Sequence, residues 1–304
     1  MGTDNVFFKN LSVVIPLRNM SGRLNNLFAE IRYLVAEDTQ VILVDDGSLD
    51  DTSNEITEFI FKNRFQDKII FINAKFGGPG AARNIGKDKA TRNWVCFWDA
   101  DDKRNLDLMK ATMNLTFAAD LILTDFQKIN TVGNLEVTKH RVFPFATHDL
   151  LVNGGLWRVV FNSKIIKNID FLNLMIGEDL IFLAKVLDLS PIILRISQVT
   201  YFYHVGQEAQ ITSGKFINKD ALISINVIFG QLEAHKIRRN QFIAVVLVKL
   251  IKTSLRNQKW VGFKALIRIV YGGKLQNLVR NSLLIFYGLV LMLKIKALGK
   301  IVYN

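Results

Sequence analysis

The sequence predicts an α/β protein with a mainly parallel central sheet, helices on both faces of that sheet, and a helical extension at its C-terminal end. Three observations lead to this prediction. Continuous apolar runs alternate with segments of helical spacing, which is typical of parallel strands buried on both faces. Polar and charged residues follow the carboxyl ends of these runs. From about residue 216 the spacing is helical throughout, so we expect domains at 1–215 and 216–304.

The composition agrees with a folded protein. Half of the 304 residues are hydrophobic and only 4 are proline, which excludes a disordered or low-complexity chain. The single cysteine, Cys96, excludes an internal disulfide and lies in an apolar run, where a core residue is expected rather than a nucleophile. This use of cysteine suits a reducing cytosolic setting, and the first ten residues lack the apolar run of a secretory signal.

Strands and helices are predicted in alternation along the first two thirds of the chain. Strands are expected at 11–16, 40–46, 68–73, 94–98 and 121–124, and helices at 21–36, 50–64, 81–90, 106–117 and 180–189. The glycine-rich stretch 77–80 opens the third helix. Less regular patterns predict a hairpin at 126–143, a strand-like run at 156–161, one or two strands within 192–203, and a polar loop at 204–215.

Three carboxylates follow the apolar run that begins at Trp94, namely Asp99, Asp101 and Asp102. Crowded carboxylates repel one another, and Mg²⁺ or Mn²⁺, which prefer oxygen ligands, would relieve that repulsion. In a straight strand Asp99 and Asp101 would point to the same side. The alternative is a solvated acidic turn, because aspartate is common at such positions.

The other strand ends carry similar chemistry. Pro16 and Asn19 follow the first strand, Asp45 and Asp46 end the second, and Arg83 comes after the glycine-rich loop that follows the third. Ligands of open α/β sheets bind beyond the carboxyl ends of the strands. We therefore expect these residues and the acidic turn to meet on one rim of the sheet.

Taken together, these segments resemble the family 2 glycosyltransferases with the GT-A fold, which are inverting enzymes that use nucleotide sugars. The resemblance rests on residues 13–19, 44–52, 77–86 and 98–102 and on the triplet Gly177-Glu178-Asp179. Their order and spacing agree with the family across residues 11–185, and no residue beyond about 205 matches. Each segment alone is weakly specific for the family, whereas the five segments in this order are strong support for the resemblance.

The resemblance implies a donor-binding role for most of these residues. Asp46, with Asp45 beside it, would hydrogen-bond the nucleotide base, which is uracil in the commonest donors, so a UDP-sugar is expected. Pro16 and Asn19 would face the nucleotide, and Arg83 would help to hold it. The segment Asp99-Ala100-Asp101 would be the D-x-D motif, in which the two aspartates bind Mn²⁺ or Mg²⁺ at the donor diphosphate. The cation would stabilise the charge of the leaving group as a Lewis acid.

The resemblance also implies the reaction. Asp179 would be the general base that takes the proton of an acceptor hydroxyl, without a covalent glycosyl-enzyme. Glu178 would orient the acceptor or the helix terminus; from the residues alone, both acids could simply complement the positive end of a helix. The Q-x-x-R-W signature of processive synthases is missing. We therefore expect transfer of one or a few sugars to a glycan or lipid-linked acceptor in surface polysaccharide synthesis. His204 has two alternative roles, a third metal ligand or an ordinary loop histidine.

Three rival classes fit the pattern less well. A dinucleotide-binding dehydrogenase has its glycine fingerprint after the first strand, whereas this glycine-rich loop follows the third. A sugar-nucleotide pyrophosphorylase, the nearest non-transferase, has a basic glycine-rich loop where this chain has residues 16–19. A basic membrane-binding protein without catalysis would leave the carboxylates of the rim unused.

The excess of positive over negative charge is confined to the end of the chain. Residues 234–304 hold 14 lysines and arginines and no aspartate or glutamate, although the net charge of the whole chain is +12. This distribution argues against a surface that coats nucleic acid. Basic residues beside apolar runs too short to span a bilayer suit anionic lipid headgroups. We expect peripheral attachment to the cytoplasmic face of the cell membrane; the alternative is a helical domain that packs its apolar faces internally.

Overall fold

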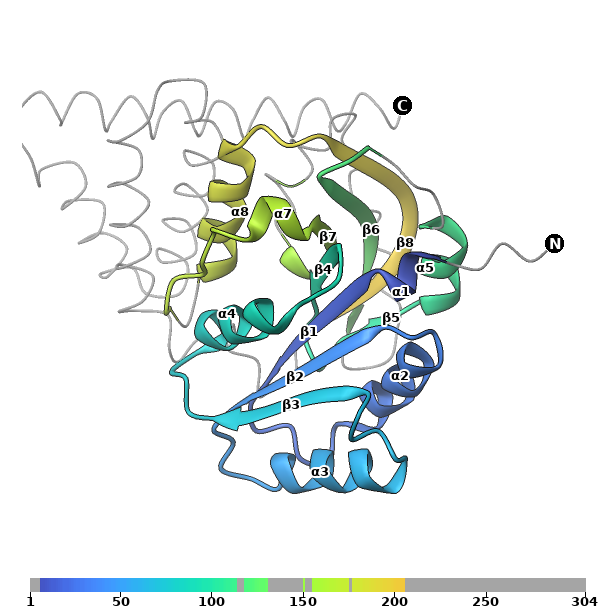
Figure 1. Cartoon of the computed structure of the whole chain (residues 1–304), viewed down its shortest axis with the longest axis vertical. Helices are drawn as coiled ribbons and strands as arrows, with labels where there is room; N and C mark the ends of the chain where they lie inside the picture. The colour runs from blue at the N-terminus through green and yellow to red at the C-terminus, as the bar shows by residue number, and fades with distance from the viewer. Residues whose placement is uncertain (1–5, 114–117, 131–149, 151–154, 175–176, 206–304) are drawn as a thin grey trace, which may run out of the picture. The chain divides into compact units, whose positions relative to one another are not determined.

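The structure is a computed structural model that describes residues 6–113, 118–130, 150, 155–174 and 177–205. Within these residues the chain forms an 8-stranded sheet with strand order β3-β2-β1-β4-β7-β6-β8-β5 (Figure 1). The distal part of the predicted hairpin, most of the loop expected at 204–215, and the whole predicted domain 216–304 lie outside the described residues.

The bounds of the described elements follow. The strands are β1 (Leu11–Leu17), β2 (Gln40–Asp46), β3 (Ile69–Ala74), β4 (Trp94–Phe97), β5 (Lys103–Arg104), β6 (Leu121–Asn130), β7 (Val159–Asn162) and β8 (Ile193–Val205). The helices are α1 (Val6–Lys9), α2 (Asn25–Ala36), α3 (Thr52–Lys62), α4 (Pro79–Lys89), α5 (Leu106–Thr112), the 3-10 turn η1 (Leu156–Arg158), α7 (Ser163–Ile166) and α8 (Glu178–Asp188).

The first half of the sheet is parallel, as the continuous apolar runs predict. β1 pairs in parallel with β2 on one side and with β4 on the other, and β2 pairs in parallel with β3. β7 then runs antiparallel to both β4 and β6, β8 is parallel to β6, and β5 is antiparallel to β8. The prediction of an α/β protein with a mainly parallel sheet is confirmed.

The two faces of the parallel half pack against different helices. Val13, Ile15 and Leu17 of β1 belong to a core that also contains buried residues of α2, α3 and α5. Val14 points to the opposite face, where α4 lies (Figure 1). There Gly86 allows α4 to approach β1 closely, because a Cβ atom at this position would lie 2.3 Å from Cγ1 of Val14.

Several element boundaries differ from the predicted ones. β4 ends at Phe97, so the acidic residues lie in a turn between β4 and β5, and the argument from a straight strand does not apply. Residues 126–130 continue β6, and the rest of the predicted hairpin is not described. The strand-like run 156–161 divides into η1 and β7. β8 extends to Val205, which places His204 in a strand and not in a loop.

The chain divides into two compact units. The first comprises residues 1–140, 155–173 and 190–207, and the second comprises 141–154, 174–189 and 208–304, so α8 belongs to the second. Among the described residues, no helix combines the length and apolar character needed to cross a membrane. The boundary predicted at 215 stays a prediction.

Candidate active site

The carboxyl end of β2 presents two adjacent aspartates with different partners. Asp45 is fully buried, and its Oδ1 accepts hydrogen bonds from the amide (3.1 Å) and the hydroxyl (2.5 Å) of Ser48. Its Oδ2 accepts a hydrogen bond from the hydroxyl of Ser53 in α3. Asp45 therefore shapes the loop between β2 and α3, and both of its oxygens have partners within that loop and helix.

Asp46 points to the other side of β2 and joins two neighbouring loops. Its Oδ1 accepts hydrogen bonds from the amides of Phe76 (2.6 Å) and Gly77 (2.8 Å), in the glycine-rich loop after β3. Its Oδ2 pairs with Nη1 of Arg18 at 3.3 Å, from the loop after β1. The Arg18 side chain is 41% exposed, whereas that of Asp46 is 4% exposed. Exposed ion pairs contribute about 0–1 kcal/mol, so Arg18 is held weakly at this place.

The loop after β1 is tied to the loop after β2. Asn19 has a left-handed backbone (φ 52°), which asparagine tolerates better than most residues. Its amide donates to Oγ of Ser48 (2.8 Å), and its Oδ1 accepts from the amide of Leu49 (2.9 Å). Pro16 lies within β1, paired in register with Val44 of β2. Asn19 therefore joins these two loops of the rim directly.

Arg83 of α4 connects the glycine-rich loop to the acidic turn. Its buried guanidinium donates from Nη2 to Oδ1 of Asp99 at 3.0 Å and lies 5.7 Å from the ring centroid of Phe171. The side chain of the next residue, Asn84, holds the main chain of Phe171: Nδ2 donates to the Phe171 carbonyl (2.9 Å), and Oδ1 accepts from the Phe171 amide (2.8 Å). The position of Arg83 is thus fixed from both sides.

The acidic turn places Asp99, Ala100 and Asp101 directly after β4. Ala100 is buried, and the Asp99 side chain is 31% exposed. Burial raises the pKa of Asp99; Arg83 opposes this increase and Asp102 adds to it. Burial, followed by the charges of Asp102 and Asp99, raises the pKa of Asp101 to about 6. The turn thus concentrates negative charge that a bound cation would offset.

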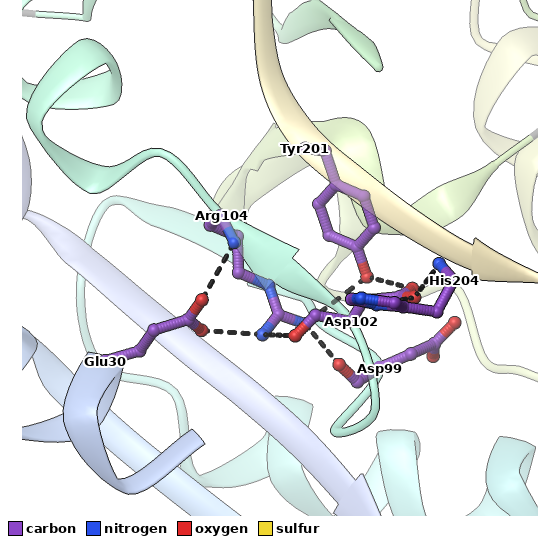
Figure 2. A network of polar contacts seen from close by, with 6 residues as sticks. All are labelled: Glu30, Asp99, Asp102, Arg104, Tyr201 and His204. Atoms are coloured by element: carbon purple, nitrogen blue, oxygen red, sulfur yellow. Dashed lines mark hydrogen bonds and ion pairs between the residues drawn. The ribbon is translucent and has the colours of Figure 1, made fainter. Parts of the chain in front are cut away.

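Asp102, the last residue of the acidic turn, is buried in a polar network (Figure 2). Its Oδ2 accepts a hydrogen bond from the hydroxyl of Tyr201 (2.7 Å), and its Oδ1 accepts one from the main-chain amide of His204 (2.7 Å). Nδ1 of His204 lies 3.6 Å from the same Oδ1. Burial, with the nearby charge of Asp102, raises the pKa of Tyr201, so its hydroxyl stays protonated and acts as a donor.

Sequence reasoning missed three members of this network, Tyr201, Arg104 and Glu30. Arg104 of β5 is buried and donates to both oxygens of Glu30 in α2, from its amide (2.8 Å) and from Nη1 (2.7 Å). The only sequence signal was a pair of basic residues, Lys103 and Arg104, after the acidic motif, and such a pair is ordinarily solvent-exposed. Cys96 is buried, as expected of a core residue, and burial raises the pKa of its thiol.

The residues of the acidic turn fit a hard divalent cation. Among the described residues, no group of three or more His, Cys, Asp or Glu side chains is arranged to hold a metal. Asp102 has protein partners on both oxygens, which leaves Asp99 and Asp101 as the acidic side chains of the turn. Two crowded carboxylates with raised pKa values suit Mn²⁺ or Mg²⁺ if phosphate and water oxygens complete the coordination.

Glu178 and Asp179 begin α8, in the second unit. Gly177 precedes them with a left-handed backbone (φ 87°). Glu178 is buried, and Oδ1 of the half-buried Asp179 accepts a hydrogen bond from the amide of Leu180 at 2.7 Å. Both acids lie in the first turn of the helix, where negative charge is favourable.

The fold is similar to that of solved glycosyltransferases. The TarS protein of Staphylococcus aureus, solved with UDP-GlcNAc, has a TM-score of 0.62 and 19% identity, over 90% of this chain and 79% of that one. The mannosyltransferase PcManGT of Pyrobaculum calidifontis, solved with GDP-Man and Mn²⁺, has a TM-score of 0.55 and 12% identity, over 96% and 86% of the two chains. The fold of this chain is therefore the GT-A fold of these two transferases.

The chain belongs to glycosyl transferase family 2, whose sequence model matches residues 12–175. An uncharacterised glycosyltransferase of Haemophilus influenzae is 27% identical over 226 residues, which are 72% of this chain and 87% of that protein. The poly(ribitol-phosphate) β-N-acetylglucosaminyltransferase TarS is 24% identical over 243 residues, and the alignment spans 74% of this chain but only 42% of TarS. The predicted family, fold and enzyme class are confirmed.

Proposed function

We propose that the protein transfers a sugar from a UDP-sugar to a hydroxyl of a glycan or lipid-linked acceptor, with inversion and with a divalent cation at Asp99 and Asp101. One observation carries the proposal: four strand-end segments meet on one rim. Arg18 contacts Asp46, Asp46 contacts the glycine-rich loop, and Arg83 contacts Asp99. Each contact joins a loop to the next, so the groups that we assign to the donor come from distant parts of the sequence and lie along a continuous edge.

The surroundings of the Asp46 carboxylate support binding of a nucleotide whose base offers an N–H donor. Two main-chain amides orient its Oδ1, and its Oδ2 faces the weakly held Arg18, which a base could displace. Uracil presents such a donor between two carbonyl groups. The likeness to TarS, which was solved with UDP-GlcNAc, agrees with a uracil nucleotide. Asp45 would act by shaping the loop beside the base, and Pro16 and Asn19 by supporting the loop that faces it.

The acidic turn supplies the electrostatic part of the mechanism. A divalent cation bound there would act as a Lewis acid for the departing diphosphate. Asp99 and Asp101 would hold it, Arg83 would hold Asp99 and add positive charge beside the phosphates, and Ala100 would leave room for the donor. Arg83 and Asp99 are already paired without the donor, and charge stabilisation lowers a barrier most effectively when its groups are placed in advance.

Asp179 would act as the general base. Its carboxylate begins a helix and is oriented by the Leu180 amide, an arrangement that keeps a base in one direction for proton transfer. Glu178, which is buried, would fix the start of α8. The acceptor proposed is a cell-surface polysaccharide or its lipid-linked precursor, because TarS, to which the chain is similar, is named for transfer to poly(ribitol-phosphate).

A panel of nucleotide sugars tests the proposal directly. We expect a UDP-sugar, and no GDP-sugar, to release its nucleoside diphosphate in the presence of Mn²⁺ and a membrane extract as acceptor. Chelation of the metal should abolish the release. A coupled assay for UDP measures the reaction, and isolation of the product identifies the anomeric configuration. Release from a GDP-sugar alone would refute the uracil assignment, and a retained anomer would refute inversion.

Variants at the two ends of β2 provide the control for the panel. Asp46→Asn should weaken UDP binding about 10- to 100-fold, because a hydrogen bond to a charged group contributes about 1.5–3 kcal/mol. Asp38→Asn, at an exposed residue before β2, should leave UDP binding unchanged. Calorimetric titration with UDP measures both. Equal UDP affinity of the two variants would remove Asp46 from the base site.

We further propose that residues 234–304 attach the enzyme to anionic membrane from the cytoplasmic side. The support is the sequence, in which Lys249, Lys252, Arg256 and Lys259 fall on one helical stripe within a segment without acidic residues. Lipid-linked acceptors lie at such a surface. The alternative occupant of the stripe is a protein partner.

Neutralising the stripe tests this attachment. Substituting these four residues with Gln should weaken binding to phosphatidylcholine–phosphatidylglycerol vesicles at least tenfold, because each basic residue near an anionic surface contributes about 1 kcal/mol. Substituting Lys62 and Lys68, which are exposed in the first unit, should have little effect. Co-sedimentation with vesicles measures binding. Undiminished binding of the fourfold variant would exclude the stripe as the membrane contact.

A further inference from the structure

Arg104 lies under the acidic turn and holds its main chain. Its Nη2 donates to the carbonyl oxygen of Asp99, and its Nη1 donates to the carbonyl oxygen of Asp102 at 3.1 Å. These two carbonyls are the first and last of the segment that contains the D-x-D motif. One guanidinium therefore spans the segment that spaces Asp99 and Asp101.

Arg104 is itself held on several sides (Figure 2). Glu30 of α2 accepts from its amide and from Nη1, and the guanidinium carbon lies 4.8 Å from the ring centroid of Trp98 and 5.0 Å from that of Tyr201. The Tyr201 hydroxyl lies 3.3 Å from Nη2. Because the side chain of Arg104 is fully buried, it cannot exchange these partners for water.

The opposite side of the turn is held by β8. Tyr201 donates to Asp102, and the His204 amide donates to the other oxygen of the same carboxylate. The ring of Tyr201 in turn stacks on Trp157 at 4.2 Å. α2, β5 and β8 therefore meet at one turn of four residues.

A buried network of charged groups contributes little net stability to a fold. Burying ion pairs costs desolvation energy, and apolar residues of similar volume are often as stabilising or more so. A metal site, by contrast, depends on how outlying groups orient the ligands. The arginine contacts the turn through main-chain carbonyls and through no carboxylate oxygen of Asp99, so it controls the shape of the turn without competing for the cation.

We propose that Arg104 is a positioning residue that sets the affinity of the acidic turn for its divalent cation, with Glu30 and Tyr201 as the groups that hold Arg104 in place. This inference rests on the metal site of the proposed function. It assigns to these three residues no contact with the donor, the acceptor or the cation.

The test is direct binding of Mn²⁺ in the presence of UDP, followed by electron paramagnetic resonance of the free ion. Arg104→Lys keeps the charge but cannot span two carbonyls and Glu30 together. We expect this variant to bind Mn²⁺ about 10- to 100-fold more weakly than the unaltered chain, the range found when outlying groups of metal sites are changed. UDP binding without metal should change less than twofold.

Two further variants keep the test decisive if Arg104→Lys folds poorly. Tyr201→Phe removes one hydroxyl, leaves the ring on Trp157, and should weaken Mn²⁺ binding to an intermediate degree. The control is Arg195→Lys, because Arg195 also lies on β8 and forms a 2.7 Å ion pair with Asp125 that is remote from the turn in the sheet register. Thermal unfolding of all variants separates loss of stability from loss of metal affinity.

The outcomes distinguish this inference from the proposed function. If the unaltered chain binds Mn²⁺ with UDP while Arg104→Lys and Tyr201→Phe bind it equally well, the positioning role is wrong and the metal site stands. If Arg195→Lys weakens Mn²⁺ binding as much as Arg104→Lys, the effect is general destabilisation and the inference is also overturned. If the unaltered chain binds no Mn²⁺ with UDP, the metal site itself fails and this inference with it.

Discussion

Replacing Asp101 with Asn is expected to reduce metal-dependent sugar transfer by at least 10²- to 10³-fold, the loss that follows removal of a group stabilising transition-state charge. Asparagine has nearly the same shape, so the turn between β4 and β5 is preserved. What changes is the charge available to hold the cation, because Asp101 is one of the two carboxylates that the turn presents. Steady-state release of nucleoside diphosphate against Mn²⁺ concentration measures the effect.

The crowded carboxylates predict an accompanying gain for the fold. Burial, followed by the charges of Asp102 and Asp99, raises the pKa of Asp101 to about 6, and so its own charge destabilises the folded turn near neutral pH. Asp101→Asn should therefore unfold at an equal or higher temperature. Vesicle binding should be unchanged, and the exposed Asp67→Asn should affect neither property. Turnover of Asp101→Asn within about twofold of normal would point to a non-enzymatic role of the turn or to another metal site.

Replacing Asp179 with Asn should lower kcat about 10²- to 10⁴-fold and leave the KM for the donor nearly unchanged. Asparagine can still accept the hydrogen bond of the Leu180 amide, so the start of α8 should persist. It cannot take a proton from the acceptor hydroxyl. Transfer is measured with the donor that the panel identifies, with Asp188→Asn at the other end of α8 as the control.

A second assay separates the base from the donor site. Binding of UDP with Mn²⁺ should be equal in Asp179→Asn and the unaltered chain, because the residue is assigned to the acceptor. Near-normal transfer by Asp179→Asn would transfer the role of base to another residue. Loss of UDP binding would place Asp179 in the donor site instead.

The rim of the parallel strands was predictable because its signals are local. Each of β1, β2 and β4 is a continuous apolar run, and parallel strands bring their carboxyl ends to one edge. Asp46, Arg83 and Asp99 could therefore be expected on that edge, and Arg83 does contact Asp99. Their roles in catalysis are implied by the family resemblance and are still predictions.

The network beneath the acidic turn was not predictable, because its members are distant in sequence and have no common pattern. Glu30 and Arg104 are separated by 74 residues, and Asp102 and Tyr201 by 99. Tyr201 belongs to an apolar run, where an aromatic residue signals only burial. Asp45 shows the opposite difficulty: beside Asp46 it looked like a second ligand-binding acid, whereas its partners are the serines of its own loop and helix.

The antiparallel strand β7 has a consequence for how such enzymes diversify. Because β7 runs against β4, its amino-terminal end, preceded by Leu156–Arg158, lies at the same edge as the acidic turn. One half of the rim thus comes from residues before 103, and the other from residues that follow much later. Under the proposed function, substitutions and insertions in the later half would change what the sugar contacts without altering the residues proposed to hold the nucleotide. The sheet order would then let the contacts to the sugar and to the acceptor vary while the proposed nucleotide contacts stay the same.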